Sequence, residues 1–302
     1  MMLGIKKLIS LLFGKGIEVN NKVADSINDS SLVKINKTDN TNNVIHQNYN
    51  ISIFSGLNVE DTIKNAMFLG NKNAQLVSED LEKLFKDNNI STEHIQTKLS
   101  NPEFLYTIAK ANEIAYLTTD ADKRKVLSRL IYDKLTKEDD IDSNTLSQSI
   151  TVMKNLTIKH LKLNALLYIV TSLYLDHFNS LDEFIDFYNK YLSKLTDIVS
   201  DTEIAKNKVA DIGTAIIGNG CAVAYTWGSR FTDFFNKNIK KYIEELCKKE
   251  DLSEKEKEQR NIIEKLNKIW DRAGLTSAAQ TAVGRCLAKT YLQDILNLDV
   301  EI

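Results

Sequence analysis

A helical repeat of apolar residues runs through most of this chain and constrains its fold more than any other feature. Apolar side chains three and four positions apart fall on one face of an α-helix. Only one proline, Pro102, and 11 glycines occur in 302 residues, and so few turn residues favour long helices over an all-β fold. The clearest stripe is formed by Leu181, Phe184, Ile185, Tyr188, Leu192, Leu195 and Val199. We therefore predict an all-α fold, a multi-helix bundle or array.

Local start signals support the same assignment. Ser180 with Glu183, and Ser253 with Glu256, have the spacing of a capping box, in which a hydroxyl and a carboxylate satisfy backbone N–H groups at a helix start. Asn101 before Pro102 places a cap ahead of proline at the first helical position. Two further capping boxes are predicted at Ser200 with Glu203 and at Ser277 with Gln280. The predicted helices span residues 58–69, 75–87, 91–99, 102–117, 121–136, 144–154, 157–177, 181–199, 202–217, 229–249, 254–273 and 277–296.

One short segment, residues 44–54, departs from the helical period. Tyr49, Ile51 and Ile53 alternate with Asn50 and Ser52, the period of two that is typical of a β-strand. An isolated strand cannot satisfy its own backbone N–H and C=O groups, so it must pair with a distant segment, a second copy or the sheet edge of a partner. We predict an intermolecular β contact carried by these three apolar residues.

The N-terminal residues form a second departure from a plain bundle. Residues 3–14 are compatible with an amphipathic helix that has Lys6, Lys7 and Ser10 largely opposite its apolar face, so it would bind a membrane surface or a partner, or pack on its own protein. Residues 17–43 are rich in Asn, Asp, Ser and Lys, which predicts a flexible linker. No secretory cleavage site follows, and no run reaches the ~18 apolar residues of a membrane span. The apolar face of the predicted helix consists of Ile5, Leu8, Ile9, Leu12 and Phe13.

These features predict three regions. Residues 1–56 form an N-terminal appendage of amphipathic helix, Asn-rich linker and strand. Residues 57–179 form a helical region, and residues 180–302 form a C-terminal helical region that packs with it. The acidic loop KEDDIDSN at residues 137–144 and the turn near residues 178–180 are both possible boundaries, and the division above is placed at the turn.

The sequence contains no catalytic motif that we could identify. The stretch GTAIIGNGCA, residues 213–222, has glycines spaced as in a phosphate loop, but it lacks the Lys and Ser/Thr that hold phosphate and magnesium. The four histidines lack zinc-ligand spacing. Aromatic residues that follow favour a buried nucleus, with a ligand groove as the alternative reading. That groove would be lined by Gly218, Gly220, Trp227 and Arg230. We predict no catalytic residue, no metal and no cofactor.

Charge and cysteine usage narrow the location and the partners. The formal net charge is −2, which argues against a protein dedicated to coating nucleic acid. Three widely spaced cysteines indicate reduced thiols rather than a disulfide framework. We expect a cytoplasmic protein, with a peripheral position at the inner membrane surface as the alternative.

Three segments resemble an uncharacterised bacterial family known by locus tags of the LPO/Vpar type. They are NYNISIFSGLNVEDTIKNAM at residues 48–67, VLSRLIYDKL with TLSQSITVMKNLTIKHLKLNALLYI at 126–169, and GLTSAAQTAVGRCLAKTYL at 274–292. The resemblance implies a helical protein and supplies no enzyme activity. Similar helical proteins occur among phage-defence and abortive-infection proteins, so the resemblance implies a role in defence.

The leading functional hypothesis is a non-enzymatic cytoplasmic protein that oligomerises, or binds a partner protein, through residues 44–54. A membrane-associated effector that uses the N-terminal amphipathic helix is the first alternative. A ligand or nucleotide sensor built around residues 213–230 is the second.

Overall fold

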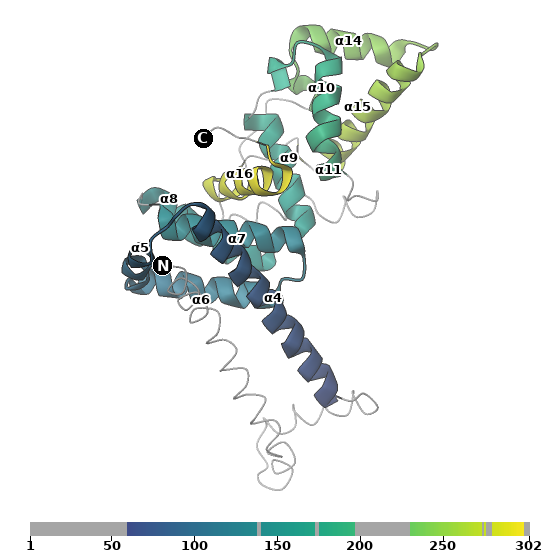
Figure 1. The fold of residues 1–302 in the computed structure, drawn as a ribbon. Helices are drawn as coiled ribbons and strands as arrows, with labels where there is room; N and C mark the ends of the chain where they lie inside the picture. Colours follow the sequence, from purple (N-terminus) through teal and green to yellow (C-terminus); the bar gives the residue numbers. More distant parts are fainter. Residues whose placement is uncertain are drawn as a thin grey trace, which may run out of the picture. The chain divides into compact units, whose positions relative to one another are not determined.

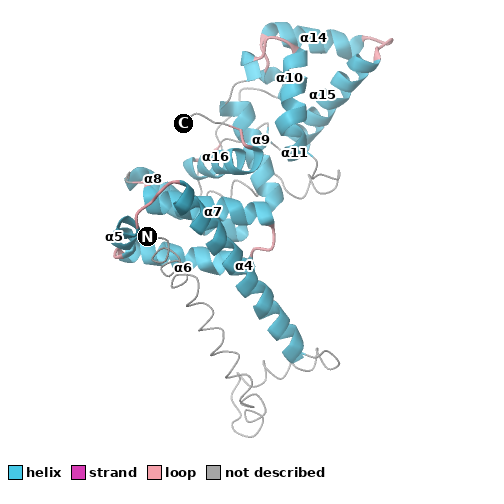
Figure 2. Ribbon diagram, in the orientation of Figure 1, coloured by secondary structure: helices cyan, strands magenta, loops and turns pink. Residues whose placement is uncertain are grey.

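The computed structural model describes residues 59–137, 140–172, 175–196, 230–273, 275 and 280–298. Every regular element among them is helical and none is a strand, which confirms the all-α class (Figures 1 and 2). The predicted N-terminal helix, linker and strand all precede Val59 and lie outside the described residues. In the described part of the chain, no helix is long and apolar enough to cross a membrane.

The chain divides into two compact units, Met1–Arg124 and Lys125–Ile302. Residues 179 and 180, between which the sequence predicted a boundary, both lie in the second unit. We call the two parts the N-terminal unit and the C-terminal unit.

The described N-terminal unit is built from α4 (Val59–Asp87), α5 (Thr92–Leu99) and α6 (Pro102–Leu117), with α6 packed against both others (Figure 1). The α6 start follows its prediction, because the Asn101 side chain accepts a hydrogen bond from the Glu103 N–H at 2.9 Å. Ser91 caps α5 in the same way. The buried face of the α4–α6 pair is formed by Ala74, Val77, Leu81, Phe85, Ile108, Ala111, Ile114 and Ala115.

The sequence predicted two helices, 58–69 and 75–87, where the structure has the single helix α4. Gly70 lies inside this helix, in close contact with Tyr116. A Cβ at this position would lie 2.2–2.4 Å from three ring atoms of Tyr116 on α6. The glycine therefore lets the ring of Tyr116 approach the α4 backbone, and the helix continues through it.

One part of the C-terminal unit consists of α7 (Ala121–Thr136), α8 (Asp140–Val152), α9 (Ile158–Ser172) and α16 (Ala282–Leu296), with the 3₁₀ turn η2 (Met153–Asn155) after α8. The first residues of α7, up to Arg124, belong to the N-terminal unit. Helix α16 packs against α8 and α9. Its start was predicted at Ser277 with Gln280, and this prediction is wrong. Helix α16 starts at Ala282, capped by Thr281, whose hydroxyl accepts from the Gly284 N–H at 3.1 Å.

A buried polar network explains why Gln280 is not part of that helix. The Asn164 side chain on α9, 2% exposed, donates to the Gly284 carbonyl at 2.6 Å. Gln280 donates from Nε2 to the Asn164 carbonyl at 2.7 Å and to Asn164 Oδ1 at 2.9 Å. The chain entering α16 is thus held to α9 by hydrogen bonds between residues far apart in sequence.

The other part of the C-terminal unit consists of η3 (Leu175–His177), α10 (Leu181–Phe187), the π-helical turn η4 (Tyr188–Leu192), α11 (Ser193–Thr196), η5 (Phe231–Phe234), α14 (Lys237–Lys248) and α15 (Glu254–Arg272). The predicted helix 229–249 is divided, because the Asn236 side chain accepts from the N–H groups of Asn238 and Ile239 and starts α14 there. Ser180 and Ser253 cap α10 and α15 as predicted.

An aromatic cluster forms the core of this part. Phe184 lies 4.7 Å from Phe235 and 6.0 Å from Phe231 between ring centroids. Trp270, which is fully buried, lies 5.9 Å from Phe231 and 5.1 Å from Phe234. Of the aromatic residues predicted to form a buried nucleus, Phe231 and Phe235 are buried and Phe234 is half-buried. Their rings make the edge-to-face and tilted contacts that aromatic rings prefer.

Candidate functional site

Large apolar side chains are left exposed mainly on the N-terminal unit. Of the six large apolar side chains that are exposed in the described residues, five lie on α4 and α6. Phe68 is 67% exposed, and Leu117 is 60% exposed. The others are Leu69, Leu105 and Tyr106. Contiguous exposed apolar surface on a folded protein marks sites of association, whereas single exposed residues do not.

Phe68, Leu69 and Leu117 lie at the same end of the α4–α6 pair, because the Gly70–Tyr116 contact joins the neighbouring positions of the two helices. We call these three residues the α4–α6 apolar surface. Figure 1 shows the first turns of α4 extending beyond α6. Asn65, Ala66, Phe68 and Leu69 are all exposed, so this turn has little buried side. A helix that is apolar on several sides is normally covered, and most helical stability comes from such tertiary packing.

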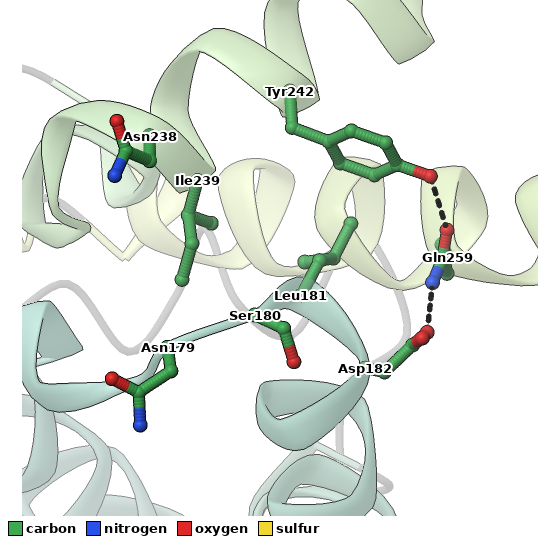
Figure 3. Close-up of a pocket in the computed structure, with 8 residues that line it drawn as sticks. All are labelled: Asn179, Ser180, Leu181, Asp182, Asn238, Ile239, Tyr242 and Gln259. Atoms are coloured by element: carbon green, nitrogen blue, oxygen red, sulfur yellow. Dashed lines mark hydrogen bonds between the residues drawn. The ribbon is translucent and has the colours of Figure 1, made fainter.

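A polar pocket of about 320 Å³ lies in the C-terminal unit between α10, α14 and α15 (Figure 3). Its apolar floor is formed by Leu181 and Ile239, and Tyr242 stands at one side. The remaining lining residues are polar: Asn179, Ser180, Asp182, Asn238 and Gln259.

A chain of hydrogen bonds orders one wall of this polar pocket (Figure 3). The Tyr242 hydroxyl donates to Gln259 Oε1 at 3.4 Å, and Gln259 Nε2 donates to Asp182 Oδ1 at 2.6 Å. Lys255 Nζ donates to the other carboxylate oxygen of Asp182 at 2.6 Å. This hydrogen bond raises the pKa of the Lys255 ammonium above its ordinary value. Gln259 is almost fully buried, so its amide is fixed in position by these two partners.

The polar pocket is lined mainly by neutral hydrogen-bonding groups. Its lining contains amides, hydroxyls and one carboxylate, and that carboxylate already accepts from Gln259 and Lys255. No cysteine or histidine lines it. Among the described residues, no group of three His, Cys, Asp or Glu side chains is placed to hold a metal ion.

Most of the site residues that the sequence pointed to lie outside the described residues. This holds for Tyr49, Ile51 and Ile53 in the predicted strand, and for Gly218, Gly220 and Trp227 in the predicted groove. It also holds for the apolar face of the predicted N-terminal helix, namely Ile5, Leu8, Ile9, Leu12 and Phe13.

Among the site residues predicted from the sequence, Arg230 is the one that the structure describes. It is exposed and precedes η5, and its backbone N–H donates to Asp233 Oδ2 at 2.9 Å. It does not line the polar pocket. Its position is that of a residue at the start of a helical turn, beside the buried Phe231.

Sequence reasoning missed the α4–α6 apolar surface and the polar pocket. The run AMFL at residues 66–69 is apolar on successive positions, and that run was the available signal for an exposed apolar turn. The polar pocket left no such signal, because its walls come from three helices whose packing a linear pattern does not show.

Comparison with known proteins places the chain in a family without assigning an activity. A protein-family model matches residues 57–249, which is more than half of the 302 residues. The family is uncharacterised and of the Vpar type, in agreement with the resemblance seen in the sequence. No curated protein and no solved structure matches the chain. The chain belongs to this uncharacterised Vpar-type family.

Proposed function

We propose that this protein is a non-enzymatic interaction protein that assembles with a second copy of itself through its N-terminal unit. The observation that carries the proposal is the concentration of exposed large apolar side chains on α4 and α6. Among the described residues of the C-terminal unit, by contrast, Tyr242 is the one large apolar side chain that is exposed. Burying apolar surface stabilises association at roughly 25 cal/mol per Å² removed from water.

The predicted strand provides the reason to choose a second copy as the occupant. Residues 44–54 precede the first residue of α4, Val59, by only a few positions. A strand that pairs between copies would therefore bring the two α4 helices close together, so both contacts would form in one assembly. Backbone pairing would fix the geometry, and Phe68 and Leu69 would supply buried apolar area.

The proposed location is the cytoplasm, and the proposed setting is bacterial defence against phage, which rests on the family resemblance. A membrane-associated effector that uses residues 3–14 is the alternative that the same experiment separates. In that case the chain would bind lipid vesicles, and the α4–α6 apolar surface would not control its mass in solution.

The test is the solution mass of the full chain by light scattering over a range of concentrations. The Phe68→Gln/Leu69→Gln variant keeps good helix formers on exposed positions, so it should fold. We expect the wild type to be an oligomer and this variant to dissociate at lower concentrations. Tyr242→Gln is the matched control, since Tyr242 is also a large exposed side chain (41%) but lies in the C-terminal unit.

Ile51→Pro tests the strand separately, because proline removes a backbone donor from a paired strand. We expect this variant to assemble more weakly than the wild type. A wild type that is monomeric at every concentration would overturn the proposal. An oligomer that tolerates both the Phe68/Leu69 and the Ile51 variants would place the interface elsewhere and overturn it equally.

A further inference from the structure

The C-terminal unit holds a second cavity with a different character from the polar pocket. It has a volume of about 280 Å³ and lies between the C-terminal end of α7, helix α8 and the first turns of α16. Three cationic side chains line it: Lys137 on the α7 side, and Arg285 and Lys289 on α16. We call it the cationic pocket.

Two of these cations, Arg285 and Lys289, are not paired with the carboxylate that shares the lining. Asp133 is held by Arg129 at 3.0 Å and by Lys137 at 3.6 Å. Burial raises the pKa of Asp133, while these two cations oppose that effect. Asp133 is therefore already paired with two positive charges, one of which comes from outside the pocket lining.

Arg285 and Lys289 have no acidic partner among the described residues. The guanidinium of Arg285 donates to the neutral carbonyl of Gln280 at 3.1 Å. Lys289 is half-buried and makes no hydrogen bond or ion pair within the described part of the chain. The two residues are four positions apart, so they lie on one face of α16 and one above the other. Arg285 is exposed and Lys289 is half-buried, so both side chains are accessible to an anion that enters the cavity.

The geometry points to a small-molecule site in the cationic pocket that takes a ligand with one oxyanion group, a phosphate or a carboxylate. A guanidinium fork and an ammonium are the side chains that recognise such groups in proteins. Thr145, Thr290 and Gln293 make the rest of the lining largely polar. The volume is at the small end of ligand pockets and does not suit a dinucleotide.

Cys286 makes the cationic pocket directly testable, because it lines the cavity and its thiol is not in a disulfide. Cys247 is exposed on α14 and serves as an internal reference in the same molecule. The experiment measures the alkylation rate of each cysteine in the full chain by mass spectrometry, at low ionic strength. Inorganic phosphate, adenosine monophosphate and succinate are the three probes.

We expect at least one probe to slow the alkylation of Cys286 several-fold while Cys247 reacts at an unchanged rate. Protection by phosphate or the nucleotide but not by succinate would assign a phosphate group, and the reverse would assign a carboxylate. The protection should be lost in Arg285→Gln/Lys289→Gln. It should persist in Lys237→Gln/Lys241→Gln, which removes two exposed lysines four positions apart on α14.

A rise in melting temperature gives a second readout, which does not depend on the reactivity of Cys286. A ligand that binds only the native state raises the melting temperature of the wild type but not of the double variant. No protection and no rise with any of the three probes at millimolar concentration would overturn the proposal.

Two acidic residues of the chain itself are tested as competitors of the ligand for the cationic pocket. Glu138 and Asp139 follow Lys137 in sequence and lie outside the described residues. The variant Glu138→Gln/Asp139→Asn removes both charges. Protection of Cys286 in the wild type supports the proposed site. Protection that appears only in this variant would overturn it, because the chain's own carboxylates would then be the anion that the cations serve.

Discussion

The two compact units treat their large apolar side chains in opposite ways. In the N-terminal unit, Phe68, Tyr106 and Leu117 are exposed on α4 and α6. In the C-terminal unit, Phe184, Phe231 and Trp270 are fully buried, and Phe231 contacts both of the other rings. A buried aromatic cluster stabilises a unit without help from a partner, whereas an exposed apolar turn gains stability only when something covers it. This difference is the basis for the proposal that the N-terminal unit makes the intermolecular contact, while the aromatic core stabilises the C-terminal unit.

The cavities follow the same division. Both the polar pocket and the cationic pocket lie in the C-terminal unit, where helices from distant parts of the sequence enclose them. Concave sites need rigid walls to position a few polar groups. We therefore expect small ligands to bind the C-terminal unit and macromolecular contacts to be made by the N-terminal unit.

The largest predicted change in the free energy of unfolding comes from truncating a buried aromatic ring, and it tests the contrast between the two units. Trp270→Ala should lower the free energy of unfolding by about 3–5 kcal/mol, the typical loss for a large aromatic removed from a core. Phe68→Ala should change it by less than about 0.5 kcal/mol, since Phe68 already faces solvent. Urea unfolding at low chain concentration measures both values. Similar losses for the two variants would break the comparison, because Phe68 would then belong to a core.

A second prediction concerns the buried polar network that joins α9 to α16. Asn164→Leu keeps the side-chain size but leaves the Gly284 carbonyl without its donor and removes an acceptor of the Gln280 amide. Leaving such groups buried and unpaired costs about 1–3 kcal/mol.

The measurement is again urea unfolding, with Asn189→Leu as the control. Asn189 is exposed on η4, so its substitution should cost less than about 0.5 kcal/mol. A loss for Asn164→Leu as small as that of the control would mean that the Asn164–Gln280 network does not hold α16 in place.

The described fold was predictable wherever its causes are local. Asn101, Ser180 and Ser253 were recognised as caps from the few residues that follow each of them, because a cap acts within one helical turn. The all-α class followed from the apolar period, since that period records which face of each helix is buried.

The errors in the predicted fold arose where a contact between residues far apart in sequence determines where a helix begins or whether it continues. The continuity of α4 depends on α6, to which Asn73 is also joined by a 3.4 Å hydrogen bond to the carbonyl of Tyr116 across 43 positions. The true start of α16 depends on Asn164, 116 positions away from Gln280.

The candidate sites were less predictable than the fold for the same reason. Exposure of Phe68 depends on where α6 stops covering α4. The run AMFL in α4 indicates an apolar turn, but it does not show whether another helix covers that turn. The cationic pocket combines Lys137 with Arg285 and Lys289, which a single sequence does not bring together.

A third prediction, with a smaller expected effect on stability, concerns the close contact between Gly70 and Tyr116 in the N-terminal unit. Alanine is favoured over glycine inside a helix by about 1 kcal/mol, but overpacking costs about 1–3 kcal/mol. Since a Cβ at Gly70 would overlap the Tyr116 ring, we expect Gly70→Ala to destabilise the protein by about 1 kcal/mol net.

The double variant Gly70→Ala/Tyr116→Ala separates the two contributions. Removing the ring removes the overlap, so adding Gly70→Ala to Tyr116→Ala should stabilise rather than destabilise. Equal effects of Gly70→Ala in both backgrounds would show that the Tyr116 ring does not limit the space at this position. The contact between α4 and α6 would then be loosely packed at Gly70.

The smallest predicted effect lies on the surface of the C-terminal unit, at the start of α15. Hydrogen bonds from Lys249, and from the backbone and side chain of Ser253, lower the pKa of Glu256 to about 2. A lowered folded-state pKa means that this carboxylate stabilises the fold above its ordinary pKa near 4.5, and that the stabilisation is lost as the pH falls toward 2.

Glu256→Gln should therefore reduce stability slightly at pH 7, and the difference from the wild type should shrink between pH 4.5 and pH 2. Melting temperatures of the two proteins across this range measure the difference. Glu258→Gln is the control, since Glu258 is an exposed neighbour on the same helix. A difference that stays constant with pH would show that the Glu256 carboxylate is not held by Lys249 and Ser253. The stability of the C-terminal unit would then rest on its buried core alone, without a contribution from the charged start of α15.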